Sequence, residues 1–176
     1  KSDVWKIRLI ENRAKLDFTR FARKHKILVH KYLAEYDYSI YVDGKIKIIG
    51  DFTQFIMKYS KGNPLLCFPH YERDCLYEEM EACVQLKKDD EFVMREQVTA
   101  YKQEGYPTHD GLIDSACLIR NHRDAQLCRV MEDWWNEVMR KSKRDQISFG
   151  YACWKNNFCY DICDLFIYDN DYTRIC

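Results

Sequence analysis

Short runs of strand character alternate with amphipathic helical stretches along this chain, and this alternation limits its possible folds more than any other feature. The clearest helix is expected over residues 123–142, where Leu127, Met131, Trp134 and Val138 recur at helical spacing. Strands are expected within residues 38–43, 45–49, 63–70, 111–121 and 158–176. Strands that alternate with helices predict an α/β fold with a mixed, mostly parallel sheet flanked by helices.

The remaining helical stretches have recognisable boundaries. They are expected from residue 13 to about 24 and over residues 50–60, 73–90, 90–106 and 142–156. Asp51 and Asp74 are the expected N-caps of the helices over 50–60 and 73–90, because an aspartate can accept the unpaired N–H groups of a first turn. Ser142 is expected to start the last helix. In the helix over 73–90, Glu79 and its neighbouring glutamates are expected to face mainly outwards.

Length and charge exclude several classes of protein. The chain has 176 residues, of which 47% are hydrophobic, so we interpret residues 1–176 as one folded domain. Lys plus Arg and Asp plus Glu both number 28, and a formal net charge of zero argues against nucleic acid as the main partner. No apolar stretch reaches the ~18 residues that a transmembrane helix needs. The first 16 residues do not resemble a signal peptide, and we interpret the chain as a fragment that lacks its N-terminal strands.

The nine cysteines predict the kind of cellular compartment in which the chain works. Their number is odd and no two are spaced as Cys-x-x-Cys. Several occupy positions that suit an apolar side chain, so we expect free thiols in a reducing, cytoplasmic environment. The alternative is the Golgi lumen, if an upstream segment carries a membrane anchor.

A carboxylate and a glycine end the first expected strand. Asp43 and Gly44 follow residues 38–42 directly. Ligands of open α/β sheets gather at the carboxyl ends of strands, and an aspartate there can hold a divalent cation that also contacts phosphate. Gly44 would permit an unusual backbone angle and the close approach of a ligand. The alternative is an Asp-Gly turn in a hairpin that joins residues 38–43 to 46–49.

Two polar clusters lie at expected helix starts. Asp145 and Gln146 could accept hydrogen bonds from sugar hydroxyls and donate to them, or Asp145 could simply be an acid in a helical first turn. His70 and Arg73 follow a strand and enter a helix, where Arg73 would suit a phosphate. His70 could instead be a satisfied histidine of the core or of a loop.

Basic residues elsewhere could contribute to the same chemistry. Arg120 and His122 lie just beyond the strand expected over 111–121, where they could form part of a site or only a polar loop. Arg20, Arg23 and Lys26 precede the first strand and could reach a nucleotide or remain solvated.

Several stretches, taken in order, resemble the glycosyltransferase-like domain of the TOD1/MUCI70 type. They include "SIYVDGKIKI", "FPHYERDCLYEE", "GLIDSACLIRNH" and "SKRDQISFGYACWK", and the resemblance runs from about residue 20 to 155. It implies a GT-A-like fold and a hexosyltransferase-like enzyme of polysaccharide biosynthesis that uses a nucleotide-sugar donor and a glycan or other hydroxyl acceptor. In that fold an Asp-x-Asp motif holds Mn²⁺ or Mg²⁺ on the donor diphosphate.

Lys45 stands where the second acid of that motif is expected. The metal could be held by Asp43 with His122 or His70, or the Lys45 ammonium could neutralise the diphosphate directly. By this resemblance Gly44, Arg73, Arg120 and His70 would also bind the nucleotide sugar, and Asp145 and Gln146 would contact the donor sugar or the acceptor. The alternatives are a hydrolase that uses the same site on a sugar nucleotide or an amide lipid, and a non-catalytic domain that binds carbohydrate or a partner.

Overall fold

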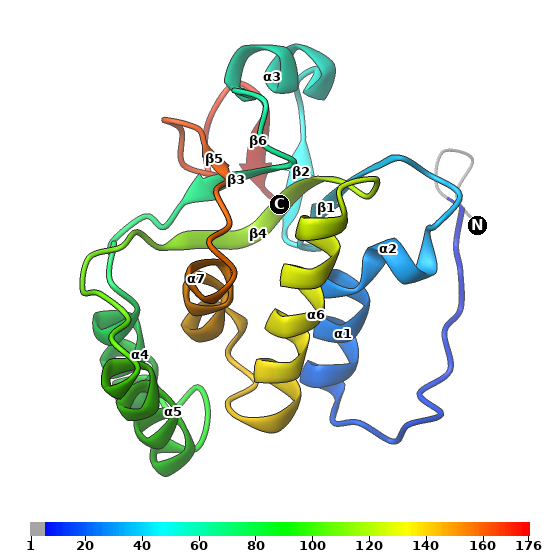
Figure 1. Cartoon of the computed structure of the whole chain (residues 1–176). Helices are drawn as coiled ribbons and strands as arrows, with labels where there is room; N and C mark the ends of the chain where they lie inside the picture. The colour runs from blue at the N-terminus through cyan, green and yellow to red at the C-terminus, as the bar shows by residue number, and fades with distance from the viewer. Residues whose placement is uncertain (1–5) are drawn as a thin grey trace.

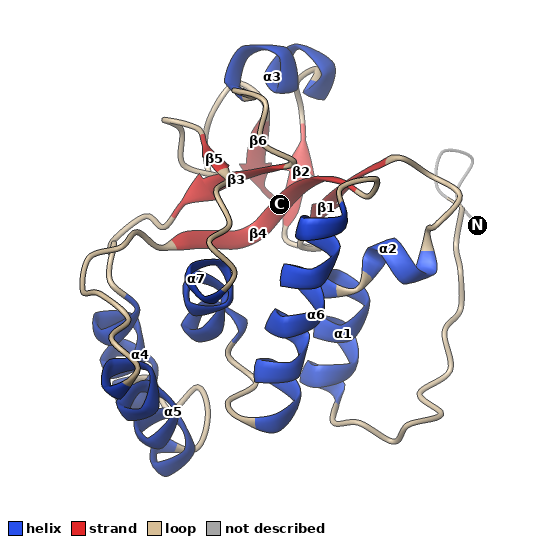
Figure 2. Cartoon of the chain, viewed as in Figure 1, coloured by secondary structure: helices blue, strands red, loops and turns tan. Residues whose placement is uncertain are grey.

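The computed structural model describes residues 6–176. Residues 1–5, part of the N-terminal stretch that does not resemble a signal peptide, lie outside the described residues. The described residues form seven helices and six strands (Figures 1 and 2). The helices are α1 (Phe18–Ile27), α2 (Val29–Tyr32), α3 (Phe52–Tyr59), α4 (Leu76–Gln85), α5 (Glu91–Gln103), α6 (Ala125–Arg140) and α7 (Asp145–Lys155). The strands are β1 (Tyr38–Val42), β2 (Ile46–Ile48), β3 (Leu65–Pro69), β4 (Ile113–Asn121), β5 (Asp161–Ile162) and β6 (Thr173–Ile175). Within residues 6–176, every helix is too short or too polar to span a bilayer.

The main sheet confirms the α/β class but corrects the predicted strand directions. Its order is β1-β4-β3-β5, with β4 antiparallel to both β1 and β3, and β3 parallel to β5. The sheet is therefore mixed, and the expectation of a mostly parallel one is wrong. Helices α4 and α5 connect β3 to β4, and their path decides at which end of the sheet β4 begins. The apolar pattern of β4 does not encode this direction.

The hairpin considered for Asp43 and Gly44 does not form. β1 pairs with β4, whereas β2 pairs with β6 in a separate two-stranded sheet. The Asp43 amide donates to the carbonyl of Ala116, 2.8 Å away, which extends the pairing of β1 by one residue. Residues 43–45 therefore connect two sheets, and Asp43 lies at the carboxyl end of an edge strand.

Helices cover one face of the main sheet, and a smaller layer covers the other (Figure 1). Helices α1, α6 and α7 pack on the first face, where the predicted stripe of α6 is buried and Trp134 is fully inaccessible. Helix α3 and the β2–β6 sheet pack on the opposite face around Phe55 and Phe68. A third apolar cluster joins α4, α5 and α7, with the Tyr101 and Tyr151 rings stacked 3.7 Å apart. This last cluster fixes α4 beside the start of α7.

Capping side chains decide where several helices begin. Aspartates cap four of them: Asp17 on α1, Asp51 on α3, Asp90 on α5 and Asp124 on α6. Helix α1 therefore starts at Phe18, later than predicted. Asp74 does not cap α4, because its carboxylate binds His109 Nδ1 at 2.7 Å. Ser142 binds Asp89 instead of starting a helix, so Asp145 and Gln146 are the first two residues of α7.

Candidate functional site

A cavity opens where the carboxyl ends of β1 and β3 meet the start of β4. This meeting follows from the strand directions, because β4 runs opposite to both neighbours. The cavity has a volume of about 310 Å³, and α1, α4 and the start of α7 complete its walls. Its charged lining residues are Arg23, Lys26, Lys45, Arg73, Lys88, Arg144, Asp43, Glu79, Asp114 and Asp145.

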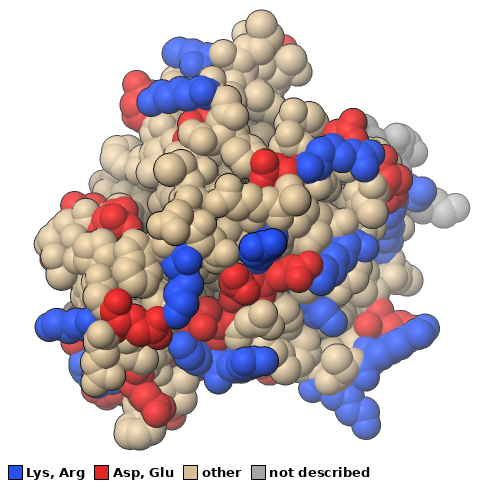
Figure 3. Space-filling view, viewed as in Figure 1, with Lys and Arg blue, Asp and Glu red and all other residues tan. Residues whose placement is uncertain are grey.

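The charge of this cavity differs from that of the molecule as a whole. Acidic and basic side chains are interspersed over the face of the protein that Figure 3 shows. The cavity instead has six Lys or Arg residues against four Asp or Glu residues, a formal excess of two positive charges. A local excess of this kind favours an anionic ligand even though the chain carries no net charge.

An irregularity in the sheet brings part of β4 into the cavity. Cys67 of β3 lies opposite Leu118, but the next residue, Phe68, lies opposite Asp114, so three residues of β4 have no partner on β3. Bulges of this type redirect side chains and are common beside active sites. Here the irregularity accompanies the placement of Asp114 and Ser115 on the cavity wall.

Besides Arg23 and Lys26, the structure brings six further residues predicted from the sequence to this one cavity, whereas Arg20 is not among its lining residues. The six are Asp43, Lys45, His70, Arg73, Asp145 and Gln146. Gly44 adjoins them and is exposed, and no atom lies within 4 Å of the position a Cβ would take there. Its backbone is not in the left-handed region, so the unusual angle expected of Gly44 is absent, although the open space beside it remains.

Arg120 and His122 lie away from this cavity, and the predictions that they join it are corrected here. Arg120 is 1% exposed, and its guanidinium donates to the carbonyl of Lys26, 2.7 Å away at the end of α1. The His122 amide bonds to the carbonyl of Asp37, before β1, whereas Asp43 follows β1. Six residues of extended chain separate those two aspartates by about 20 Å, too far for one metal ion.

Asp145 is buried at the centre of an ion-pair cluster. Its carboxylate lies 2.6 Å from Lys26 Nζ and 2.9 Å from Arg23 Nε, and the Ser115 hydroxyl donates to it from 3.1 Å. Burial alone would raise the pKa of Asp145, but the charges of Lys26 and Arg23 outweigh burial and lower the pKa below its usual value. Asp145 is therefore a fixed anion that accepts hydrogen bonds, and it is a poor proton acceptor at neutral pH.

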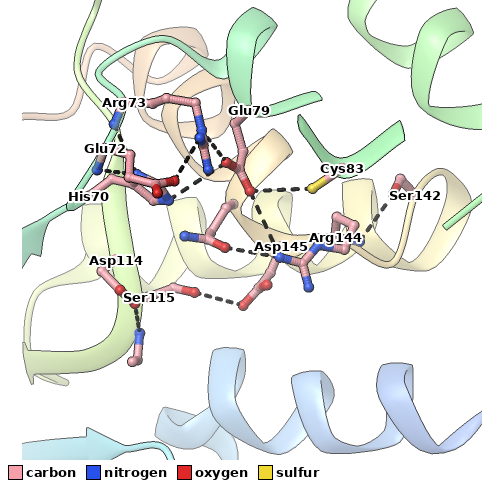
Figure 4. Close-up of polar contacts among 12 residues, drawn as sticks. His70, Glu72, Arg73, Glu79, Cys83, Asp114, Ser115, Ser142, Arg144 and Asp145 are labelled. Atoms are coloured by element: carbon pink, nitrogen blue, oxygen red, sulfur yellow. Dashed lines mark hydrogen bonds and ion pairs between the residues drawn. The ribbon is translucent and has the colours of Figure 1, made fainter. Parts of the chain in front are cut away.

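Glu79 organises the opposite wall, and the prediction that it faces outwards is wrong. The residue is 4% exposed, and its carboxylate binds Arg73 Nε at 2.8 Å and lies 3.6 Å from His70 Nε2. Arg144 approaches the same carboxylate at 3.9 Å, and Figure 4 shows these side chains converging on Glu79. One buried anion thus positions three nitrogen-bearing side chains that line the cavity.

The hydrogen bonds of His70 fix its protonation pattern. Its Nδ1 accepts the backbone N–H groups of Glu72 and Arg73 at 3.2 and 3.1 Å. A neutral ring that accepts at Nδ1 carries its proton on Nε2, which here faces Glu79. Burial lowers the pKa of His70 despite the nearby Glu79 charge, so the neutral form is favoured.

Tyrosine side chains engage both Asp43 and Lys45. The Tyr41 hydroxyl donates to Asp43 Oδ1 at 2.5 Å, and the Lys45 ammonium lies 3.3 Å from the Tyr168 hydroxyl. Burial raises the pKa of Tyr168, and the nearby Asp114 carboxylate raises it further. Tyr168 therefore contacts a cation of the cavity from a segment that sequence reasoning did not associate with the site.

Comparison with known proteins identifies the family of this sequence. The sequence matches the family described as "TOD1/MUCI70, glycosyltransferase-like domain" over residues 1–173. The chain belongs to this family. A curated relative, "Probable hexosyltransferase MUCI70" of Arabidopsis thaliana, is 29% identical over 161 residues, which cover 85% of this chain. The matched region spans 27% of the length of that relative.

The residues present do not fit the metal site that an Asp-x-Asp motif implies for a member of this family. Lys45 replaces the second acid, and His122 lies at the other end of β1. His70 accepts two backbone N–H groups at Nδ1, and its protonated Nε2 faces Glu79. Asp43 and Asp114 both line the cavity, but nowhere in residues 6–176 do three or more His, Cys, Asp or Glu side chains gather as a metal-binding group.

Proposed function

We propose that this domain is a glycosyltransferase that transfers a sugar from a nucleotide-diphosphate donor to a hydroxyl acceptor. The single observation that carries the proposal is the convergence of Asp43, Lys45, Arg73 and Asp145, from three parts of the chain, on one positively charged cavity. Its volume lies at the lower end of the range of about 300–1,000 Å³ that is usual for small-molecule sites. Family membership and the hexosyltransferase-named relative support the same reaction class.

The proposed chemistry is electrostatic. Cleavage of the bond between sugar and diphosphate builds negative charge on the leaving phosphate, and fixed cations at that position stabilise the transition state. Lys45 and Arg73 are suited to this role because both are oriented beforehand, by Tyr168 and Glu79. Asp145 would hold a sugar or acceptor hydroxyl by accepting its hydrogen bond. A GT-A-like placement of donor and acceptor is part of the proposal.

The polar lining distinguishes this proposal from an amide-lipid hydrolase. The apolar side chains that reach the cavity are few, with Ala82, Leu86 and Ala116 the principal ones beside its charged residues. A lipid chain would need a larger apolar surface. Hydrolysis of a sugar nucleotide uses the same donor site, and it is recognised by nucleotide release with water as the sole acceptor.

A thermal-shift panel of UDP-, GDP-, CMP- and dTDP-sugars tests the proposal. A donor that binds only the folded protein must raise the unfolding midpoint. We expect one donor class to stabilise the protein, Arg73→Met to weaken that response, and Asp145→Asn to retain part of the donor response but lose transfer. Asp164→Asn is the matched control, because Asp164 is exposed and outside the cavity. An absence of response to every donor, or a normal response in Arg73→Met, would contradict the proposal.

A further inference from the structure

The six cations of the cavity differ in whether they contact a carboxylate. Lys26 and Arg23 are paired with Asp145, and Arg73 and Arg144 approach Glu79. No ion pair within 4.0 Å is found for the other two, Lys45 and Lys88, among the described residues. Lys45 and Lys88 are therefore the two cations of the cavity that no carboxylate contacts directly, although Asp43 and Asp114 also line its wall.

Lys45 is the better placed of these two for a phosphate at the strand ends. It lies two residues after Asp43, whereas Lys88 follows the carboxyl end of α4 on the opposite wall. The C-terminal segment fixes Lys45 twice: the Cys176 amide donates to its carbonyl at 2.9 Å, and Tyr168 contacts its side chain. The ammonium also lies 4.7 Å from the centre of the Tyr168 ring.

This contact leaves the ammonium able to bind a ligand. A lysine ammonium has three N–H donors, and the Tyr168 hydroxyl takes one of them. Lys45 is exposed, so its remaining donors can reach an anion without a change in the fold. A divalent ion bound beside Asp43 would instead have to lie close to this positive charge.

We propose that the Lys45 ammonium, positioned by Tyr168, binds phosphate oxygens where the family resemblance implies a divalent cation. A pyrophosphate group then binds this cavity without a divalent metal. The inference rests on the proposed function, because a diphosphate is taken as the class of ligand. In this arrangement Tyr168 is a positioning residue, and Lys45 makes the direct contact.

Isothermal titration with inorganic pyrophosphate tests the inference in two buffers, one with EDTA and one with excess Mg²⁺ or Mn²⁺. We expect saturable binding in EDTA that the metal does not tighten. Lys45→Met should weaken binding about tenfold or more, as expected for the loss of a charge-assisted contact. Lys47→Met is the matched control, because Lys47 is exposed on β2 and outside the cavity. Binding only with metal, or no binding in either buffer, would overturn the inference.

The role of Tyr168 is separable from a contribution to folding. Tyr168→Phe keeps the ring but removes the hydroxyl, so it should weaken pyrophosphate binding by less than Lys45→Met. The double variant should bind no more weakly than Lys45→Met alone, because both changes act on one contact. If the two losses add, Tyr168 does not act through Lys45, and that part of the inference is wrong.

The two proposals fail in different ways. Transfer from a nucleotide sugar that depends strictly on Mn²⁺ would leave the glycosyltransferase standing and overturn the metal-independent site. Pyrophosphate binding in EDTA, with neither transfer nor a response to any nucleotide sugar, would support the anion site and overturn the proposed reaction.

Discussion

Replacement of Lys26 by methionine tests the ion-pair cluster on which the cavity is built. The side chain of Lys26 is 2% exposed, and its ammonium donates to Asp145 at 2.6 Å and to Ser115 at 2.8 Å. Methionine keeps most of the apolar stem but removes the charge. Asp145, 1% exposed, would then keep Arg23 as its ion-pair partner, at 2.9 Å.

The expected cost follows from the burial of both charges. Removal of one partner from a buried pair typically costs ~3–5 kcal/mol, because the other charge stays desolvated. Arg23 remains, so we expect the lower end, about 3 kcal/mol of unfolding free energy at pH 7. The lowered pKa of Asp145 means that its pairing stabilises the fold above its unfolded pKa of about 4 and is lost as the pH falls through the folded pKa. The difference between wild type and Lys26→Met should therefore shrink below about pH 4.

Urea denaturation of four proteins measures this effect: wild type, Lys26→Met, Asp145→Asn and the double variant. The double variant should lose less than the sum of the single losses, because each single change leaves a charge without its partner. Lys24→Met is the control, since Lys24 lies on the same helix and is less buried. A loss below about 1 kcal/mol in Lys26→Met, or additive losses at an unchanged denaturant slope, would refute the reasoning.

Two further substitutions probe the packing of α7 and the Glu79 wall of the cavity. Gly150→Ala should destabilise the protein by about 1–3 kcal/mol, seen as a lower thermal midpoint, because the new Cβ would lie 2.5 Å from the buried Tyr106 hydroxyl; an unchanged midpoint would contradict this packing. Glu79→Gln should cost about 1.5–3 kcal/mol in urea unfolding and weaken donor stabilisation, because it removes the charge that holds Arg73. If Glu79→Gln kept the stability and the donor response of the wild type, Glu79 would not position Arg73.

Local pattern was sufficient to predict most elements but not their pairing. The stripe of α6 and the apolar runs of β3 and β4 follow directly from side-chain periodicity. The pairing of β2 with β6 joins residues more than 120 positions apart, such as Ile46 and Ile175, and neither strand carries a signal for its partner. Tyr168 reaches Lys45 because of that pairing, so the sequence alone could not reveal the contact.

Glu79 is a different case, because the sequence did contain a signal. It lies three residues after Leu76 and four before Cys83, both of which are buried, so it falls on the apolar stripe of α4. A carboxylate buried on such a stripe destabilises the fold unless a cation pairs with it. Arg73, six residues earlier, was the available partner.

The ion pairs of the two buried acids limit how this cavity can act on a substrate. Asp145 is held ionised by two cations, and Glu79 is surrounded by Arg73, Arg144 and the Nε2–H side of His70. Asp145, whose pKa is lowered, is a poor proton acceptor near pH 7, and Glu79 holds Arg73 in place. Both instead fix charges in advance around the space where a donor would bind, which is how preorganised electrostatics lowers a barrier. A transferase built this way would depend on stabilisation of its leaving group more than on a strong general base.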